Sequence, residues 1–280
     1  MRPLMVLACA AGIVSLMASA EAQEAFPIYQ PIEEFGTYGP QNASSAPALT
    51  HAETMQFEQA VSAMEQFPPY LYSGCHDRAH AAYMMLPESL RLKTKKIWVV
   101  GPSRYTAAIQ GTIGLRATDS ASQKVDWGYH VALAVETPVG MRLFDPALQP
   151  GATLTRDEWF ALMKLPRMSI WTITTGELYL FNYATLNMAA KNGTEIWNGN
   201  ANYYHLYSPK DRIIPDNLAR DAVGVDALRG LTCSAIQLRL ADPQELLNLL
   251  NGGVANVPTD CVSSVQKFEA EKARWTAKLH

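Results

Sequence analysis

A glycine followed by a cysteine, at the start of a helical pattern, constrains this 280-residue chain more than any other feature. After Gly74, the small and apolar residues that recur at helical spacing are Cys75, Ala79, Ala82 and Leu86. A cysteine in the first turn of a helix lies at the positive end of the helix dipole, which favours its thiolate form. Thiolates attack carbonyl carbons, so the pattern predicts that Cys75 is a nucleophile to which the fold must bring a base.

The composition is that of an ordinary globular protein. Hydrophobic residues make up 48% of the chain, enough for a sizeable core, and the formal net charge is −3. This near-neutral balance gives no reason to expect nucleic acid or an anionic membrane as a partner. Because residues 51–280 contain no internal repeat and no low-complexity linker, we expect them to form one domain of a monomeric protein.

The first residues have the pattern of a secretory signal peptide. Arg2 supplies a positive charge, residues 4–17 are apolar, and small residues at alternate positions mark cleavage sites before residue 23. The apolar run is short for a membrane span, so we expect no stable membrane anchor. Residues 1–22 are therefore predicted to be removed, the protein to be secreted or periplasmic, and residues 23–50 to be an extended lead-in rich in Pro, Gly, Ser and Ala.

Cysteine usage agrees with this destination. Removing the signal peptide removes Cys9 and leaves three cysteines, an odd number for an oxidising compartment. The economical arrangement pairs Cys233 with Cys261 and leaves Cys75 as a free, reactive thiol. A buried inert thiol, or a different pairing, remains the alternative on cysteine counting alone.

A candidate base lies in the strand predicted over residues 127–135. The sequence alternates there, and His130 falls on the same face as three small residues, Gly128, Ala132 and Ala134. We expect the N-terminus of the Cys75 helix to pack against this face and so to bring the thiol to His130.

A candidate carboxylate follows the next predicted strand. Residues 141–144 come after a turn containing Pro138 and Gly140, so the two strands should form an antiparallel hairpin. Asp145 ends the second strand, where it can orient the imidazole of His130 and stabilise its charged form. An Asp before Pro is also a common turn former, which is the competing explanation for this residue.

Two other histidines compete with His130. His76 follows Cys75 directly and is predicted to point away around the helix. His80 is five residues on, about 140° around the axis, so it cannot face the thiol. Together His76 and His80 have the spacing of a zinc-protease motif, but Asp77 replaces its glutamate and no third ligand is apparent nearby.

The remaining segments alternate between helical and extended patterns, which predicts an α+β fold. Thr155 and Glu158 form a capping box at the start of a helix over residues 155–163. The other predicted helices cover residues 52–67, 216–228, 243–250 and 262–278, and the other strands cover residues 96–100 and 170–186, with a long loop at 102–126 and loop plus strand at 197–207.

Three segments resemble the bacterial protein-glutaminase family, whose members deamidate glutamine side chains within proteins. They are Cys75-x-x-Arg78-Ala79-His80, Trp127-x-Tyr129-His130-Val131-Ala132 and Asp145-Pro146-x-Leu148. The stretch with Tyr203-Tyr204, Ser208-Pro209 and Asp216-Asn217-Leu218 is similar to the C-terminal part of that family, so the resemblance runs from Ser73 to Cys233.

This resemblance implies a papain/transglutaminase-like core, with a Cys75, His130, Asp145 triad and a helix N-terminus packed on an antiparallel sheet. It implies a glutamine-containing protein or peptide as the substrate, a Cys75 thioester, and no cofactor or metal. The Cys75 backbone N–H would help to bind the oxyanion. Trp127 and Tyr129 flank His130 and are candidate walls of the substrate pocket, although strand aromatics are more often core residues.

Other readings stay open at this stage. A transglutaminase or a cysteine peptidase could use the same triad, because the acceptor and the substrate groove decide between them. A zinc hydrolase built on His76 and His80, and a secreted binding protein with a structural Cys75, are the remaining alternatives. Compared with the family, the loop between Lys96 and Trp127 is longer, and no large inhibitory pro-segment is expected before Cys75.

Overall fold

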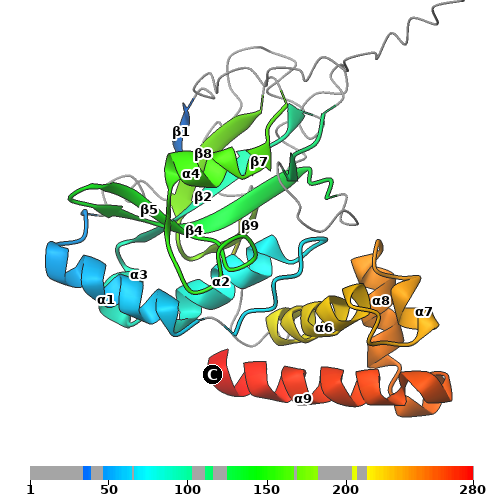
Figure 1. Cartoon of the computed structure of the whole chain (residues 1–280). Coiled ribbons are helices and arrows are strands. Elements are labelled where there is room, and N and C mark those ends of the chain that lie inside the picture. The colour runs from blue at the N-terminus through cyan, green and yellow to red at the C-terminus, as the bar shows by residue number, and fades with distance from the viewer. Residues whose placement is uncertain are drawn as a thin grey trace, which may run out of the picture. The chain divides into compact units, whose positions relative to one another are not determined.

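A computed structural model describes residues 34–38, 47–64, 66–102, 111–115, 125–166, 169–181, 204–206 and 213–279 (Figure 1). The span Glu33–His280 forms one compact unit. The predicted signal peptide, residues 1–22, lies outside the described ranges. Within those ranges, no helix combines the length and the apolar character that crossing a membrane requires.

The centre of the fold is a six-stranded sheet with the order β1-β8-β2-β4-β5-β6. Its strands are β1 (Glu34–Tyr38), β8 (Ile170–Thr175), β2 (Thr94–Val100), β4 (Tyr129–Thr137), β5 (Gly140–Phe144) and β6 (Leu154–Thr155). Only the β1–β8 pair of this sheet is parallel, and β1 falls in the segment predicted as an extended lead-in. The α+β class and the antiparallel sheet are therefore confirmed.

The predicted hairpin of β4 and β5 is confirmed, and its register positions the site. Leu133 pairs with Phe144, the last residue of β5, while β4 begins four residues earlier at Tyr129. On this side the first residues of β4 therefore have no β5 partner. Gly140 closes the turn with φ of 108°, a conformation that favours glycine.

Helices cover both faces of the sheet. Figure 1 shows α1 (His51–Ser62) and α2 (Cys75–Met85) on one side and α4 (Arg156–Ala161) on the other. Between α1, α2 and the sheet lies a buried cluster that includes Phe57, Val61, Ala81, Ala82, Leu86, Leu133, Val135 and Phe144. The Thr155–Glu158 capping box predicted for α4 is confirmed.

The face of β4 on which α2 packs differs from the prediction. Leu133 and Val135 share the buried cluster with α2, and Tyr129 contacts His76 of α2. These residues are on the face opposite to Gly128, Ala132 and Ala134, so the expected packing on the small-residue face is wrong. The helix approaches closely because it carries small residues itself, among them Ala81 and Ala82, which are fully buried.

Several short elements complete this part of the fold. The predicted strand 170–186 is two strands, β8 and β9 (Leu178–Phe181), which are separated at Gly176, and residues 182–186 lie outside the described ranges. A Cβ at Gly176 would lie 2.7 Å from the Tyr83 ring, so the chain turns where only glycine fits. The other short elements are α3 (Glu88–Arg91), β3 (Gly114–Leu115) paired with β7 (Met163–Lys164), and β10 (Tyr204–Leu206) paired with β9. Strand β3 interrupts the loop predicted over residues 102–126.

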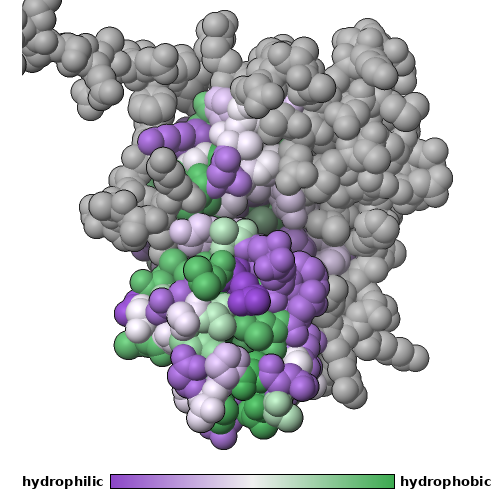
Figure 2. All heavy atoms as spheres, turned by 90° about the vertical axis from the view of Figure 1, so that its right-hand side faces the viewer, coloured by the Kyte–Doolittle hydropathy of each residue, from purple (hydrophilic) through white to green (hydrophobic). Residues whose placement is uncertain are grey.

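The C-terminal part is a group of helices. They are α6 (Ile213–Leu228), α7 (Ser234–Gln237), α8 (Pro243–Asn251) and α9 (Val262–Leu279), with short 3₁₀ turns at Val254–Asn256 and Thr259–Cys261. The side of the molecule in Figure 2 shows apolar and polar side chains intermixed over this group. Leu231 and Leu238, between α6 and α8, are 68% and 82% exposed.

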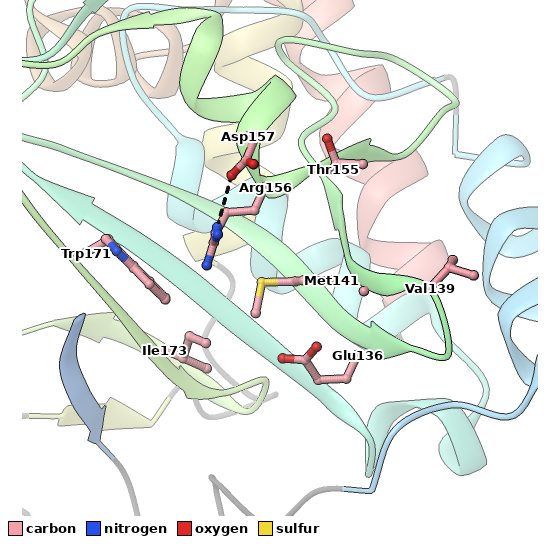
Figure 3. A pocket seen from close by; sticks show the side chains of 9 residues that line it. Glu136, Val139, Met141, Thr155, Arg156, Asp157, Trp171 and Ile173 are labelled. Carbon is pink, nitrogen blue, oxygen red and sulfur yellow. Dashed lines mark hydrogen bonds and ion pairs between the residues drawn. The ribbon is translucent and has the colours of Figure 1, made fainter. Parts of the chain in front are cut away.

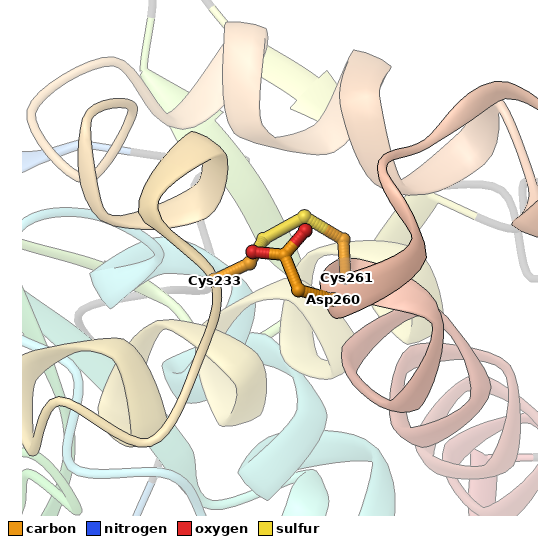
Figure 4. A group of neighbouring side chains, drawn as sticks. All are labelled: Cys233, Asp260 and Cys261. Carbon is orange, nitrogen blue, oxygen red and sulfur yellow. A yellow bond between two sulfur atoms is a disulfide. The ribbon is translucent and has the colours of Figure 1, made fainter.

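A disulfide joins Cys233 and Cys261 across the base of this helical group, as the cysteine count predicted (Figure 4). Both cysteines are buried in an apolar cluster with Val223, Ile236, Leu250 and Phe268. The bond closes a loop over a sequence separation of 28 residues. It therefore ties the start of α9 to the segment that follows α6.

Removing this disulfide should lower the free energy of unfolding. For a loop of this size, the loss of the cross-link in the variant Cys233→Ala/Cys261→Ala is expected to cost about 3 kcal/mol. Urea unfolding of the variant and of the oxidised wild type measures this difference. Reduced wild type, which also lacks the cross-link, is the matched control. An unchanged free energy of unfolding would show that the cross-link does not constrain the unfolded chain.

Candidate active site

The turn before α2 places Cys75 at the start of the helix. Gly74 is the N-cap, with φ of 77°, and supplies no side chain to cap the helix. A Cβ at this position would lie 2.3 Å from Asp221 Oδ2, so both the backbone conformation and the packing require glycine. Cys75 is a free thiol and is partly exposed. The prediction that a reactive cysteine opens this helix is consistent with the turn.

A buried polar network beneath the turn fixes its position. Arg78, one turn along α2, donates to Asp221 of α6 at 2.6 Å. Arg220 donates to the other oxygen of Asp221 at 2.7 Å and to the Ser73 hydroxyl at 2.9 Å. The side chains of Arg78 and Asp221 are almost completely buried. Removing either partner would therefore leave the other with an uncompensated buried charge, which is strongly destabilising. Sequence reasoning missed Arg220 and Asp221 because no local pattern links α6 to residue 74.

His130 and Asp145 are brought together as predicted. The Nε2 atom of His130 and the Oδ2 atom of Asp145 are 2.5 Å apart, and both side chains are buried. The other carboxylate oxygen accepts the backbone N–H groups of Ala147 and Leu148 at 3.1 and 3.4 Å. Asp145 therefore both forms the turn before Pro146 and contacts the imidazole, while its role in orienting His130 for catalysis stays a prediction.

Two tryptophans enclose the His130 ring. Trp127 stacks on it with ring centroids 4.1 Å apart and an interplanar angle of 7°, and Trp159 of α4 stacks with centroids 5.6 Å apart. Trp127 Nε1 donates to the Leu71 carbonyl at 2.6 Å, and Trp159 Nε1 donates to Asp145 Oδ2 at 2.8 Å. These contacts fix the plane of the imidazole and its distance from Asp145.

These positions refine the predictions for the aromatic residues. Trp127, a predicted pocket wall, is 7% exposed, so most of its surface packs inside the protein. Trp159 was missed, because a tryptophan in the predicted helix 155–163 has no sequence signal that relates it to Asp145. Tyr129 is half-buried and its hydroxyl lies 2.8 Å from His76 Nδ1.

The thiol and the imidazole form a pair with altered pKa values. Burial alone would raise the pKa of Cys75, but hydrogen bonds and charge interactions with His130 and His76 outweigh it and lower the pKa to about 6. Burial alone would lower the pKa of His130, but the Asp145 carboxylate and the contact with Cys75 raise it to about 9. His130 Nδ1 is buried without a conventional hydrogen bond, so it is the nitrogen that remains for the thiol proton.

Asp145 stays ionised in this buried place. Burial raises its pKa, but the charge of His130 and hydrogen bonds from His130 and Trp159 have the larger combined effect and lower it. A permanent negative charge on Asp145 favours imidazolium over neutral imidazole. Between about pH 6 and about pH 9, the resting state is therefore a thiolate paired with an imidazolium.

The two histidines of α2 occupy different environments. The ring of His76 lies between Tyr129 and Asp77, with Nδ1 2.8 Å from the Tyr129 hydroxyl and Nε2 3.5 Å from Asp77 Oδ2. That it points away from the thiol stays a prediction. His80 turns to the sheet instead, where its Nδ1 lies 2.8 Å from the buried Lys96 Nζ. The Lys96 amine therefore occupies this nitrogen of His80, and among the described residues no third ligand lies beside His76 and His80, which counts against a zinc site there.

The group with metal-ligand spacing among the described residues is elsewhere. It consists of Cys233, Asp260 and Cys261. Figure 4 shows the Asp260 carboxylate beside the disulfide that joins the two sulfurs. Disulfide sulfurs are not thiolates, which are the ligands that metals require from cysteine.

A separate groove of about 350 Å³ lies near the other end of β4 (Figure 3). Its lining includes Glu136, Met141, Arg156 and Trp171, and the Arg156 guanidinium lies over the Trp171 ring at 5.4 Å. Glu136 is six residues from His130 along the strand, about 20 Å at 3.3 Å per residue. The groove is therefore distinct from the site formed by Cys75, His130 and Asp145.

A family comparison agrees with this chemistry. Residues 53–163 match the family model described as "Glutaminase", a range that contains Cys75, His130 and Asp145. This match confirms the resemblance seen in the sequence and the prediction of a glutaminase-type amidohydrolase. No curated protein matches the chain. Among solved structures, the chain is similar to protein-glutaminase from Chryseobacterium proteolyticum, with 18% identity, a TM-score of 0.38, and coverage of 66% of this chain and 90% of that one.

Breaking the buried network should destabilise the fold. In Asp221→Ala, Arg78 and Arg220 would keep buried charges without their carboxylate, which is expected to cost about 3 to 5 kcal/mol of unfolding free energy. Urea unfolding measures the loss. Asp157→Ala is the matched control, because Asp157 pairs with Arg156 on the surface and should change stability little. Equal effects of the two substitutions would contradict the role assigned to Asp221.

The pH dependence of Cys75 alkylation should report the ion pair. The rate with iodoacetamide should rise with a midpoint near the thiol pKa of about 6 and stay high above pH 9, because the thiolate persists after His130 loses its proton. In Asp145→Asn, the imidazolium loses its carboxylate partner, so the midpoint should move up toward the ordinary thiol value of about 8.5. A wild-type midpoint already at that value would refute the ion pair.

Proposed function

We propose that this chain hydrolyses the side-chain carboxamide of glutamine residues in proteins or peptides, giving glutamate and ammonia. Cys75 is the nucleophile, His130 is the general acid and base, and Asp145 orients His130. The observation that carries the proposal is the buried contact of Asp145 with His130, together with the effect of His130 on the Cys75 thiol, within a segment that matches the glutaminase family. The chemistry of these three residues requires no cofactor or metal.

The first half of the reaction forms a thioester. The Cys75 thiolate attacks the carboxamide carbon, and the carbonyl electrons move to the oxygen. Collapse of this adduct breaks the C–N bond, and His130 gives its Nδ1 proton to the leaving nitrogen. The backbone N–H groups in the first turn of α2 lack intrahelical acceptors, so that of Cys75 can donate to the oxyanion.

The second half releases glutamate. His130, now neutral, takes a proton from water, and the resulting hydroxide attacks the thioester carbon. The C–S bond breaks, the thiolate returns, and the imidazolium is restored beside Asp145. The two stacked tryptophans keep the ring in one orientation during both proton transfers, because rotation would separate Nδ1 from the sulfur.

The same three residues could serve a transglutaminase, in which a lysine amine replaces water, or a cysteine peptidase, in which the backbone amide is cleaved. The glutaminase match favours a carboxamide substrate and hydrolysis. A secreted or periplasmic location is part of this proposal, supported by the signal-peptide pattern of residues 1–22 and by the Cys233–Cys261 disulfide.

Ammonia release from a glutamine-rich protein such as a wheat gluten fraction tests the assignment. The wild-type chain should release ammonia without cross-linking or shortening the substrate. Cys75→Ala and His130→Ala should each lower the rate at least about 10³-fold, because either change removes a member of one catalytic unit. Far-ultraviolet circular dichroism and urea unfolding of each variant establish that the fold is retained.

The outcomes separate the competing functions. Ammonia accompanied by cross-linked product indicates acyl transfer to an amine, and shortened chains indicate a peptidase. Retention of wild-type rate in a folded Cys75→Ala or His130→Ala variant would rule out the proposed roles. Above about pH 9, deamidation should decline although alkylation does not, since only deamidation needs the proton on His130.

A further inference from the structure

The nucleophile and the base belong to a helix and a strand that must be held in a fixed relation. Cys75 opens α2, and His130 is the second residue of β4, in the part of the strand that has no β5 partner. The apolar cluster shared by α2 and β4 involves Ala81 and Ala82, about 9 to 10 Å along the helix from Cys75. Apolar packing is non-directional, and the Arg78 network ties the first turn to α6 rather than to β4. Another contact is therefore needed to align this turn with the strand.

Side-chain contacts join the helix and the strand beside the reacting groups. The Tyr129 hydroxyl lies 2.8 Å from His76 Nδ1, and the Trp127 indole donates to the Leu71 carbonyl at 2.6 Å. Tyr129 directly precedes the base, and His76 directly follows the nucleophile. Trp127 and Leu71 lie in the segments that lead into β4 and α2. Each contact therefore joins the chain next to the base with the chain next to the nucleophile.

The ring of His76 is also held from other directions. Asp77 Oδ2 lies 3.5 Å from Nε2, and the Tyr179 ring of β9 packs edge-on against the imidazole with centroids 5.2 Å apart. Asp77 is itself fixed, because its other oxygen accepts the Tyr179 hydroxyl at 2.6 Å and the Asn217 amide at 3.0 Å. A carboxylate beside Nε2 favours a proton on that nitrogen, so Nδ1 accepts the Tyr129 hydroxyl when the ring is neutral. When the ring is protonated, Nδ1 donates to the same hydroxyl oxygen, so the contact does not require one charge state of His76.

The strand side of these contacts is anchored in the sheet. Tyr129 pairs with Val100 of β2, and its ring packs against Trp98 with centroids 5.9 Å apart. Trp127 exchanges two backbone hydrogen bonds with Ile113, at 2.7 and 2.8 Å. Hydrogen bonds are directional, so a bond from the Tyr129 hydroxyl to α2 places the first turn of the helix more narrowly than apolar packing does.

We propose that Tyr129 and His76 are positioning residues, whose contact holds the first turn of α2 at the start of β4 and so sets the distance between the thiol and the imidazole. The contact of Trp127 with Leu71 supports the same alignment from the segment before the turn. In this role neither Tyr129 nor His76 touches the reacting atoms, so loss of their contact leaves the triad present but misaligned. The consequence for catalysis rests on the proposed function, whereas the alignment of thiol and imidazole is a property of the resting protein.

The first variant is Tyr129→Phe, which removes the hydroxyl and keeps the ring. The midpoint of Cys75 alkylation by iodoacetamide should rise by about half a pH unit, because the thiolate is less closely paired with the imidazolium. With a glutamine-containing peptide, at a pH well above both midpoints, kcat should fall about 10-fold with little change in KM, since misaligned groups still bind the substrate. The matched control is Tyr83→Phe, the same change at a half-buried tyrosine about 12 Å along α2, and it should alter neither quantity.

A double-mutant cycle tests whether Tyr129 acts through His76. Tyr129→Phe should raise the alkylation midpoint in the wild-type background and leave it unchanged in the His76→Leu background, where the partner of the hydroxyl is already absent. Equal shifts in the two backgrounds would overturn the inference. If His76→Leu does not fold, the midpoint in Tyr129→Phe alone decides, since a raised midpoint supports the inference and a wild-type midpoint overturns it.

The two readouts separate positioning from the other roles that Tyr129 could have. A raised KM with an unchanged alkylation midpoint in Tyr129→Phe would show that Tyr129 is a wall of the substrate pocket, and would overturn the positioning role. A midpoint and a kcat that both stay at wild-type values would overturn it as well. A raised midpoint in a protein that deamidates no glutamine would support the alignment of thiol and imidazole and refute the proposed reaction.

Discussion

The site depends on a positive charge held on a histidine that is fully removed from water. Burial opposes the charging of His130, and the ionised carboxylate of Asp145, 2.5 Å away, reverses that preference. Asp145 can stay ionised because four groups donate to it, namely His130, the Trp159 indole and the backbone N–H groups of Ala147 and Leu148. The pKa of the Cys75 thiol is lowered chiefly by this one imidazolium and by His76.

The remainder of the described fold holds the two halves of this pair together. His130 and Asp145 come from the hairpin of β4 and β5, where β4 extends past the end of β5. Cys75 comes from α2, whose first turn is fixed by the buried contacts of Arg78 and Ser73 with α6. The disulfide joins the segment after α6 to the start of α9, so the helical group that supports the turn is itself cross-linked.

Local signals in the sequence were sufficient for much of this arrangement. The glycine before Cys75, the turn between the two strands and the capping box at Thr155 are short-range patterns, and each forms the predicted element. The pairing of Cys233 with Cys261 followed from counting. The face of β4 that α2 covers was harder to predict from the sequence. Both faces of the strand are apolar over residues 131–135, so alternation does not indicate which one a helix covers.

Residues that act across the fold could not be found in this way. Trp159 and Asp221 lie 14 and 143 residues from Asp145 and Arg78, which they contact, and neither lies in a recognisable motif. The contact between His76 and Tyr129 is of the same kind, because local spacing does not reveal that the first turn of α2 lies beside β4.

The most direct test of the account follows the oxygen that enters the substrate. A peptide with one internal glutamine is incubated with the wild-type chain in water enriched in oxygen-18, and the product is sequenced by mass spectrometry. Hydrolysis through a Cys75 thioester predicts conversion of that glutamine to glutamate, with one labelled oxygen in its side chain and an intact backbone, and no conversion by Cys75→Ala. An unchanged glutamine, or label at a cleaved backbone carboxyl group, would contradict it.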